Sequence, residues 1–248
     1  MSAVGRFPTV LELPSGLKLQ VSMTFPQLRT LPDGKKLAVC SHPWSRLGGS
    51  MHDPVLHSLV GPLSSKLGYH VLLFNSRGVG SSSGWASFTG LQEAQDLQEL
   101  VTCVVQRLGS VKDVALIGYS NGCLSTSIHP LVSAPPVRTS HVLISYPLDV
   151  RGWLSLFNGR TYQAGFESLM CNPESRILVI FGDRDEFTGM SSYDRWIQRL
   201  QRIATHGQTR TEVGSSLRTV RIGGGTHFWR GDDLTRMIAA VEEFLQMC

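Results

Sequence analysis

An apolar run leads directly into a Gly-x-Ser-x-Gly pattern near the middle of the chain. Residues 114–122 read Val-Ala-Leu-Ile-Gly-Tyr-Ser-Asn-Gly. This arrangement is typical of a nucleophile elbow, in which a serine lies on a sharp turn between a strand and a helix. Gly118 and Gly122 suit such a turn because a Cβ at either position would clash with the neighbouring backbone. We therefore expect Ser120 to project its hydroxyl into a cleft.

A second stretch of the chain fits the same five-residue pattern. It is Gly80–Gly84, with Ser82 at its centre. The apolar run before it, Val71–Phe74, ends several residues earlier, and the next helical pattern starts only beyond Trp85. An elbow needs a strand directly before the serine and a helix directly after it, so the context favours Ser120.

Two further polar groups follow apolar runs later in the chain. Asp183 and Asp185 come after the run 178–181, and His227 comes after the run 220–222 and three glycines. A serine hydroxyl is a weak nucleophile until a base takes its proton, and that base needs a carboxylate to fix its tautomer. Parallel strands carry their functional loops at their carboxyl ends. The sequence therefore supplies a nucleophile, an acid and a base at expected strand ends, in the order found in α/β-hydrolases.

From about Lys36 to its C-terminus, the chain resembles the α/β-hydrolases. It is most similar to small single-domain members with a His-Pro stretch, a Gly-Gly pair and an Arg-Gly-x-Gly loop, which stand here at 42–43, 48–49 and 77–80. The resemblance implies a serine hydrolase of the esterase or peptidase type that needs no metal or organic cofactor.

Position by position, the resemblance makes Ser120 the nucleophile, Asp185 the acid and His227 the base. Asp185 occupies the acid position of the family's Gly-x-x-Asp pattern, while Asp183 lies nearer the strand end and stays open as an alternative, with a turn residue as its other interpretation. His206 is the other histidine after the acid, in a polar stretch. A loop histidine without chemistry is the alternative for His227.

An acyl-transfer site also needs donors for the oxyanion. One donor in this fold is the backbone N–H of the residue after the nucleophile, here Asn121, and the other comes from the loop after the third strand. That strand is predicted over 36–41. Pro43 has no N–H to donate, so Trp44 is the predicted second donor. His42 and Pro43 also have a purely structural interpretation, in which they shape the turn.

The N-terminal part of the chain carries strand and helix-start signals. Two short strand patterns, at 10–13 and 17–23, are separated by Pro-Ser-Gly and indicate an antiparallel hairpin at a sheet edge. Asp53 followed by Pro54 is typical of the first residues of a helix.

Helical and strand patterns alternate over the rest of the sequence. Apolar residues recur at helical spacing in the ranges 55–67, 91–108, 193–203 and 234–245. Strands alternating with such helices predict an α/β fold with a mostly parallel sheet covered on both faces. With 248 residues and no internal repeat or linker, we expect a single domain over 1–248.

The irregular stretch 147–175 lies where many hydrolases of this fold carry a lid. It is too short for a full helical cap domain, so we expect a short cap that leaves the pocket open or roofed by one helix. Trp44, Trp153 and Trp229 are candidates for the wall of an apolar substrate pocket. The alternative is that these aromatics simply pack in the core.

The glycines at 78, 80 and 84 do not form a dinucleotide-binding loop, because their spacing departs from Gly-x-Gly-x-x-Gly and no helix opens there. They are interpreted as a structural turn in which Arg77 bonds backbone carbonyls and has no catalytic role.

Composition and charge limit the other function classes. The net charge is +4 with scattered charges, so no nucleic-acid surface is indicated. Five cysteines without metal-ligand spacing are interpreted as reduced thiols. No secretory signal or membrane-spanning run is visible, and we expect a cytoplasmic protein.

The leading hypothesis is a serine hydrolase that acts on a small-molecule acyl substrate, with carboxylesterase or thioesterase activity ahead of amidase or peptidase activity. An epoxide hydrolase or dehalogenase would carry Asp in place of Ser120, and a dienelactone-hydrolase-like enzyme would carry Cys. The alternative from another class is a non-catalytic binding or scaffold protein that keeps the hydrolase fold. The oligomeric state is left open.

Overall fold

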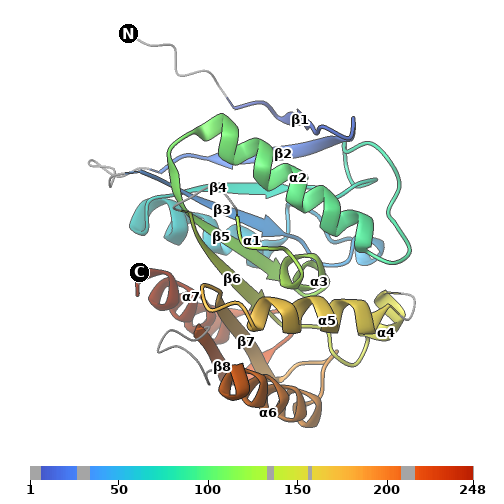
Figure 1. Ribbon diagram of the computed structural model, residues 1–248, viewed down its shortest axis with the longest axis vertical. Coiled ribbons are helices and arrows are strands. Elements are labelled where there is room, and N and C mark those ends of the chain that lie inside the picture. Colours follow the sequence, from blue (N-terminus) through green and yellow to red (C-terminus); the bar gives the residue numbers. More distant parts are fainter. Residues whose placement is uncertain (1–6, 27–33, 133–136, 156–157, 208–215, 248) are drawn as a thin grey trace.

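The chain folds around one eight-stranded sheet. The computed structural model describes residues 7–26, 34–132, 137–155, 158–207 and 216–247 (Figure 1). The strands are β1 (Val10–Glu12), β2 (Lys18–Thr24), β3 (Lys35–Ser41), β4 (Tyr69–Phe74), β5 (Val111–Tyr119), β6 (Arg138–Ile144), β7 (Arg176–Arg184) and β8 (Ser216–Thr226).

The order of the strands across the sheet is β1-β2-β4-β3-β5-β6-β7-β8. β1 pairs with β2, and β2 with β4, in antiparallel fashion. All later pairs are parallel. The predicted mostly parallel sheet with an antiparallel N-terminal edge hairpin is therefore confirmed. The carboxyl ends of β3, β5, β7 and β8 consequently lie along one edge of the sheet, which brings the predicted site residues to the same side.

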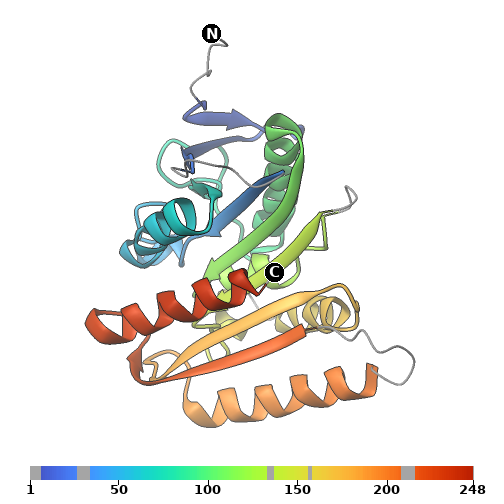
Figure 2. The ribbon, with the colours of Figure 1, turned by 90° about the vertical axis from the view of Figure 1, so that its left-hand side faces the viewer.

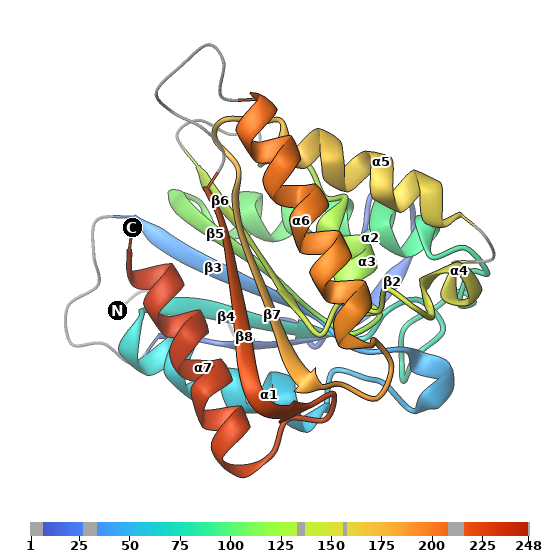
Figure 3. The ribbon, with the colours of Figure 1, turned by 90° about the horizontal axis from the view of Figure 1, so that it is seen from below.

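Helices cover both faces of this sheet, as predicted (Figures 2 and 3). One face carries the first and last long helices, whose apolar residues join one core cluster, and the other face carries the remaining long helices. The helices are α1 (Pro54–Gly61), α2 (Leu91–Leu108), α3 (Gly122–Ser127), α4 (Arg151–Leu154), α5 (Gly159–Met170), α6 (Met190–Gly207) and α7 (Gly231–Gln246).

The predicted helix start at Asp53 is confirmed, and its end lies earlier than the apolar spacing suggested. The Asp53 carboxylate accepts hydrogen bonds from the backbone N–H groups of Val55 and Leu56. α1 ends at Gly61 and continues as one π-helical turn over Pro62–Lys66. Proline lacks the N–H that the α-helical ladder requires, which explains the change of hydrogen-bond pattern at that point.

The stretch 147–175 contains α4 and α5. α5 packs onto the same face of the sheet as α3 and α6, and it buries Tyr162 and Phe166 in the core cluster of that face. Its aromatic side chains thus fill the core, whereas α4 lies at the carboxyl edge of the sheet beside the loops (Figure 3). Among the helices that the structure describes, none combines the length and apolar composition needed to cross a bilayer.

Candidate active site

Ser120 lies on the turn between β5 and α3, at the carboxyl edge of the sheet. Its backbone φ is +53°, a conformation that non-glycine residues rarely adopt and that marks a strained turn. A Cβ at Gly118 would lie 2.7 Å from the Cα of Cys123, and a Cβ at Gly122 would lie 2.2 Å from the carbonyl oxygen of Ser41. The predicted reason for both glycines is therefore confirmed, because backbone occupies the space a side chain would need, from the same turn at Gly118 and from the end of β3 at Gly122.

The structure brings the three predicted site residues into one hydrogen-bonded chain. Nε2 of His227 lies 2.9 Å from Oγ of Ser120, and Nδ1 lies 2.9 Å from Oδ2 of Asp185. A carboxylate only accepts, so Nδ1–H donates to Asp185 and Nε2 accepts from the serine hydroxyl. Both the His227 ring and the Asp185 carboxylate are buried, at 6% and 0% side-chain exposure. This is the geometry in which imidazole can take a proton from a hydroxyl.

Asp185 and Asp183 have different surroundings, although both follow the same strand run. Oδ1 of Asp185 accepts hydrogen bonds from the backbone N–H groups of Phe187 and Thr188, which orients Oδ2 toward the histidine. Asp183 instead accepts from the N–H of Gly224 and pairs with Arg221 at the surface. The Gly224 N–H, followed by the Arg221 guanidinium, holds the pKa of Asp183 below its usual range. The structure thus brings Asp185, and not Asp183, to His227.

Two residues that the sequence analysis did not single out hold the main chain of His227. Its N–H donates to Oε2 of Glu186 at 2.7 Å, and its carbonyl oxygen accepts from the hydroxyl of Tyr119 at 2.8 Å. Burial raises the pKa of Tyr119, so its hydroxyl stays a donor. Tyr119 is next to Ser120 in the sequence, and Glu186 is next to Asp185. This proximity is the one sequence signal that could have indicated their roles.

A cavity of about 250 Å³ opens at Ser120 and His227. We call it the first cavity, and it is lined by Pro43, Trp44, Leu47, Gly48, Gly49, Asp53, Tyr119, Ser120, Val150, Leu154, Phe187, His227 and Phe228. The ring of Phe187 lies edge-on to the imidazole, with centroids 4.6 Å apart. Asp53 is the acidic residue of this wall, and burial raises the pKa of its carboxyl. The wall is otherwise mainly apolar and suits an uncharged group.

The loop after β3 brings Trp44 to the same cavity as Ser120. His42 anchors this loop, because its Nε2 accepts from the N–H of Ser76 at 3.0 Å and its Nδ1–H donates to the carbonyl oxygen of Pro43 at 2.6 Å. Burial lowers the pKa of His42 and favours this neutral form. Asn121 precedes the first residue of α3, where backbone N–H groups have no partner within the helix. His42 therefore has the structural role that was its alternative interpretation.

The three tryptophans proposed for the pocket wall have different outcomes. Trp44 lines the first cavity. Trp229 is 2% exposed and belongs to the core cluster beneath α7, where its indole N–H donates to the hydroxyl of Ser145 at 3.0 Å. The prediction that Trp229 lines the pocket is therefore wrong, because a buried polar partner holds the ring in the core. The side chain of Trp153 lies outside the described part of the structure.

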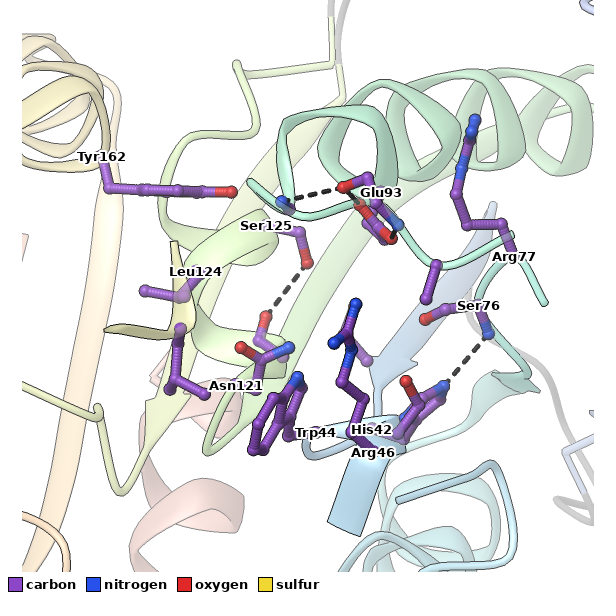
Figure 4. Close-up of a pocket in the computed structure, with 17 residues that line it drawn as sticks. His42, Trp44, Arg46, Ser76, Arg77, Glu93, Asn121, Leu124, Ser125 and Tyr162 are labelled. Carbon is purple, nitrogen blue, oxygen red and sulfur yellow. Dashed lines mark hydrogen bonds between the residues drawn. The ribbon is translucent and has the colours of Figure 1, made fainter. Parts of the chain in front are cut away.

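A second cavity, of about 50 Å³, shares Trp44 and Leu154 with the first. Figure 4 shows the residues that line it. It is lined by Ser41, His42, Trp44, Ser45, Arg46, Ser76, Arg77, Ala86, Ser87, Gly90, Glu93, Asn121, Gly122, Leu124, Ser125, Leu154 and Tyr162.

Arg77 does not bond backbone carbonyls, contrary to the expectation from sequence. Its guanidinium forms two hydrogen bonds of 2.6 Å to the carboxylate of Asp96 and one to Gln92. A nearby carboxylate on α2 offers a stronger, charge-assisted partner than a carbonyl group.

No group of three or more His, Cys, Asp or Glu side chains in the described ranges is arranged to hold a metal ion. Cys40, Cys103, Cys123 and Cys171 are free thiols.

Comparisons with known proteins agree with this architecture. No protein-family profile matches the chain. An uncharacterized protein of Schizosaccharomyces pombe is 27% identical over 169 residues, which cover 68% of this chain and 72% of that protein.

Solved structures match nearly the whole chain. A candidate α/β-hydrolase of unknown function from Agrobacterium tumefaciens has a TM-score of 0.73 at 21% identity, covering 96% of this chain and 94% of its own. A serine hydrolase without a lid from Xanthomonas campestris has a TM-score of 0.66 at 25% identity, with 97% and 94% covered. Est1E from Butyrivibrio proteoclasticus, with ferulic acid bound, has a TM-score of 0.71 at 16% identity, with 97% and 98% covered. The chain therefore has the fold of the α/β-hydrolases.

Proposed function

We propose that the protein is a serine hydrolase that cleaves carboxylic esters or related acyl compounds. The observation that carries the proposal is the continuous hydrogen-bonded chain from Ser120 through His227 to Asp185, with both links at 2.9 Å. It lies in the wall of a cavity large enough for a small organic substrate.

In the proposed mechanism, Oγ of Ser120 attacks the carbonyl carbon while its proton passes to Nε2 of His227. Asp185 holds the imidazole in the required tautomer and stabilises the imidazolium. The backbone N–H groups of Asn121 and Trp44 are the proposed donors to the oxyanion that forms. Such donors stabilise the transition state more than the substrate, because the negative charge on the oxygen develops only there.

The tetrahedral intermediate then collapses to an acyl-enzyme. The bond from carbon to the leaving oxygen breaks, and His227 gives its proton to that oxygen. A water molecule next attacks the acyl carbon and gives a proton to His227, and the serine oxygen departs with that proton. The carboxylic acid is released, and the site returns to its starting state without any cofactor.

An ester is the proposed substrate class because the first cavity is mainly apolar beside the imidazole. Phe187 and Phe228 lie edge-on to the imidazole, with ring centroids 4.6 and 5.6 Å away, and both line the first cavity. An uncharged, partly apolar alcohol or phenol fits such a wall better than a peptide amide, whose N–H would be left without a partner. Est1E, a structure of similar fold, has been determined with ferulic acid, a carboxylic acid, bound.

We further propose one domain over 1–248, in which 147–175 is a short cap that contributes Val150 and Leu154 to the cavity wall. The single sheet that runs through the chain supports this organisation. A cytoplasmic location is proposed on the four free thiols.

Labelling by a fluorophosphonate probe tests the proposal, because such a probe reacts only with a serine activated by its base. We expect an adduct on Ser120, mapped by mass spectrometry, that disappears in Ser120→Ala and His227→Ala. Heat-unfolded protein and Ser81→Ala, at an exposed serine of the second glycine-serine pattern, are the controls. Folded protein that forms no adduct and hydrolyses no ester would instead support a binding or scaffold role.

A further inference from the structure

The second cavity adjoins the first and shares two of its lining residues. Trp44 and Leu154 line both cavities, and Asn121, the residue after the predicted nucleophile, lines the second. Trp44 and Leu154 therefore stand between the two cavities, and Asn121 joins Ser120 in the sequence to the wall of the second. The first cavity contains His227, whereas the second does not.

If the proposed function holds, this arrangement indicates which cavity takes the leaving group of a substrate and which takes its acyl chain. His227 protonates the leaving group, so that group must lie on the histidine side, in the first cavity. The acyl chain extends from the carbonyl carbon in the other direction, past Asn121. The volume of the second cavity, about 50 Å³, suits an acyl chain of a few non-hydrogen atoms.

Two of the three charged side chains that line the second cavity, Arg77 and Glu93, have hydrogen-bond partners within the protein. The exception is Arg46. Arg77 is neutralised by Asp96 through two bonds of 2.6 Å. The two carboxylate oxygens of Glu93 accept hydrogen bonds from the backbone N–H and the hydroxyl of Ser87. Arg46 has no carboxylate within ion-pair distance in the described ranges, and its guanidinium lies 5.3 Å from the ring centre of Phe88.

The Arg46 side chain is directed into the second cavity. Figure 4 shows it extending from the loop after Trp44 toward the space between Asn121, Ser125 and Glu93. Ser41 supplies a second, independent observation at this cavity. Its hydroxyl belongs to a lining residue, is buried and has no hydrogen-bond partner among the described residues. Buried polar groups in native proteins are almost always paired.

We propose that the second cavity binds a short acyl group that ends in a carboxylate, and that Arg46 is the residue that selects it. The guanidinium offers paired N–H donors that match the two oxygens of a carboxylate. A four-carbon acyl group with a terminal carboxylate, such as succinyl, has the chemistry and approximate size that this site would accept. The inference rests on the proposed function and adds a substrate class to it.

Three small esters test the proposal through the ratios of their kcat/KM values. Hydrolysis is measured by the release of protons. Methyl butyrate and monomethyl succinate have acyl chains of the same length, and only the second ends in a carboxylate. The butyrate ester of glycolic acid carries its carboxylate on the leaving group instead. We expect Arg46→Gln to lower the ratio of monomethyl succinate to methyl butyrate about tenfold, because a charge-assisted hydrogen bond is lost. Arg46→Lys should lower this ratio less.

Arg107→Gln is the matched control. Arg107 is also an exposed arginine over an aromatic ring, 5.9 Å from the ring centre of Phe7, but it lies in the last turn of α2. Arg107 is about 21 Å along the helix from Glu93. The same change of net charge at this position should leave the ratio at its wild-type value.

A binding measurement separates this inference from the proposed function. In a Ser120→Ala background, calorimetry should show that Arg46→Gln weakens binding of monomethyl succinate about tenfold relative to methyl butyrate. The inference would be overturned if Arg46→Gln changed neither the kcat/KM ratio of monomethyl succinate to methyl butyrate nor their relative affinities. This holds even if a fluorophosphonate labels Ser120. An Arg46 effect on the glycolate ester alone would overturn the assignment of the acyl side. Absence of both labelling and hydrolysis, with the binding difference present, would overturn the proposed function and leave the binding site standing.

Discussion

The hydroxyl of Tyr119 donates a hydrogen bond of 2.8 Å to the backbone carbonyl of His227. Tyr119 immediately precedes Ser120, so one side chain of the elbow strand holds the loop that carries the predicted base. The N–H of the same histidine donates to Glu186, which follows Asp185. The main chain of His227 is thus held from both sides by neighbours of its two predicted partners, and its ring is positioned before any substrate arrives.

Removal of the Tyr119 hydroxyl should therefore affect rate as well as stability. We expect Tyr119→Phe to lower kcat roughly tenfold, because a small displacement of a positioned group has a large effect on rate. KM for a small ester should change less. The free energy of unfolding should fall by about 1–2 kcal/mol, since a buried hydrogen bond is lost. Steady-state kinetics and urea unfolding measure the two effects. A loss of stability with unchanged kcat would show that the rest of the loop is sufficient to position His227.

The two aspartates at the end of β7, Asp183 within the strand and Asp185 directly after it, offer a matched pair of substitutions. Asp185→Asn should lower kcat by about 10⁴, because an amide cannot hold the imidazole in the required tautomer. Asp183→Asn removes a surface ion pair with Arg221 and should change kcat by less than a few-fold. Ester hydrolysis by both variants, with circular dichroism to check folding, distinguishes them. Equal losses of activity, or a larger loss in Asp183→Asn, would contradict the assignment of the acid.

The ion pair between Arg77 and Asp96 ties the loop after β4 to α2. The two side chains are 18% and 6% exposed. Asp96→Ala should lower the free energy of unfolding by about 3 kcal/mol, because it leaves a largely buried guanidinium without its carboxylate.

The control for this variant is Glu12→Ala, which breaks an exposed pair with Lys18 that is 3.8 Å long. We expect a change within about 0.5 kcal/mol, since exposed pairs contribute little. Urea unfolding of both variants measures the difference. Similar changes in the free energy of unfolding for the two variants would mean that water solvates the Arg77 guanidinium as favourably as Asp96 does.

Two buried histidines should make stability depend on pH: His129, in the connection between α3 and β6, and His141, in the middle of β6. Burial lowers the pKa of His129 to about 4 and that of His141 to about 3. In the unfolded chain both titrate near the usual value of about 6.5. The unfolded state therefore binds protons that the folded state does not. The free energy of unfolding is highest above about pH 6.5, the pKa of the unfolded chain's histidines, and falls as the pH decreases below it. Each histidine should contribute a slope of about 1.4 kcal/mol per pH unit between about pH 6 and pH 4.

Urea unfolding between pH 7 and pH 4 measures this dependence. His141→Gln should reduce the slope by about 1.4 kcal/mol per pH unit, while the same substitution at the exposed His52 is the control. An equal slope in wild type and His141→Gln would exclude His141 as a source of the acid sensitivity.

Local signals in the sequence were sufficient for the architecture and for the turn at Ser120. The strand flush with Ser120 and the glycines on either side predicted a turn at this position, and the structure has one. The close approach of backbone at Gly118 comes from residues of the same turn, whereas that at Gly122 comes from Ser41 at the end of β3. The alternation of strand and helix patterns likewise predicted a parallel sheet with an edge hairpin. In a parallel sheet, the ends of strands meet at one edge, so even the meeting of Ser120, Asp185 and His227 follows from their positions after strands.

Side-chain partners were decided only by the tertiary structure. Trp229 turned into the core toward Ser145, and Arg77 found Asp96 on α2 rather than a carbonyl group. The contact of Tyr119 with His227 joins residues 108 positions apart. Composition and periodicity report which face of an element is buried, because burial depends on averages over a turn or a strand. A hydrogen-bond partner depends on the position of single atoms from distant segments, and only the packed sheet and its loops determine that position.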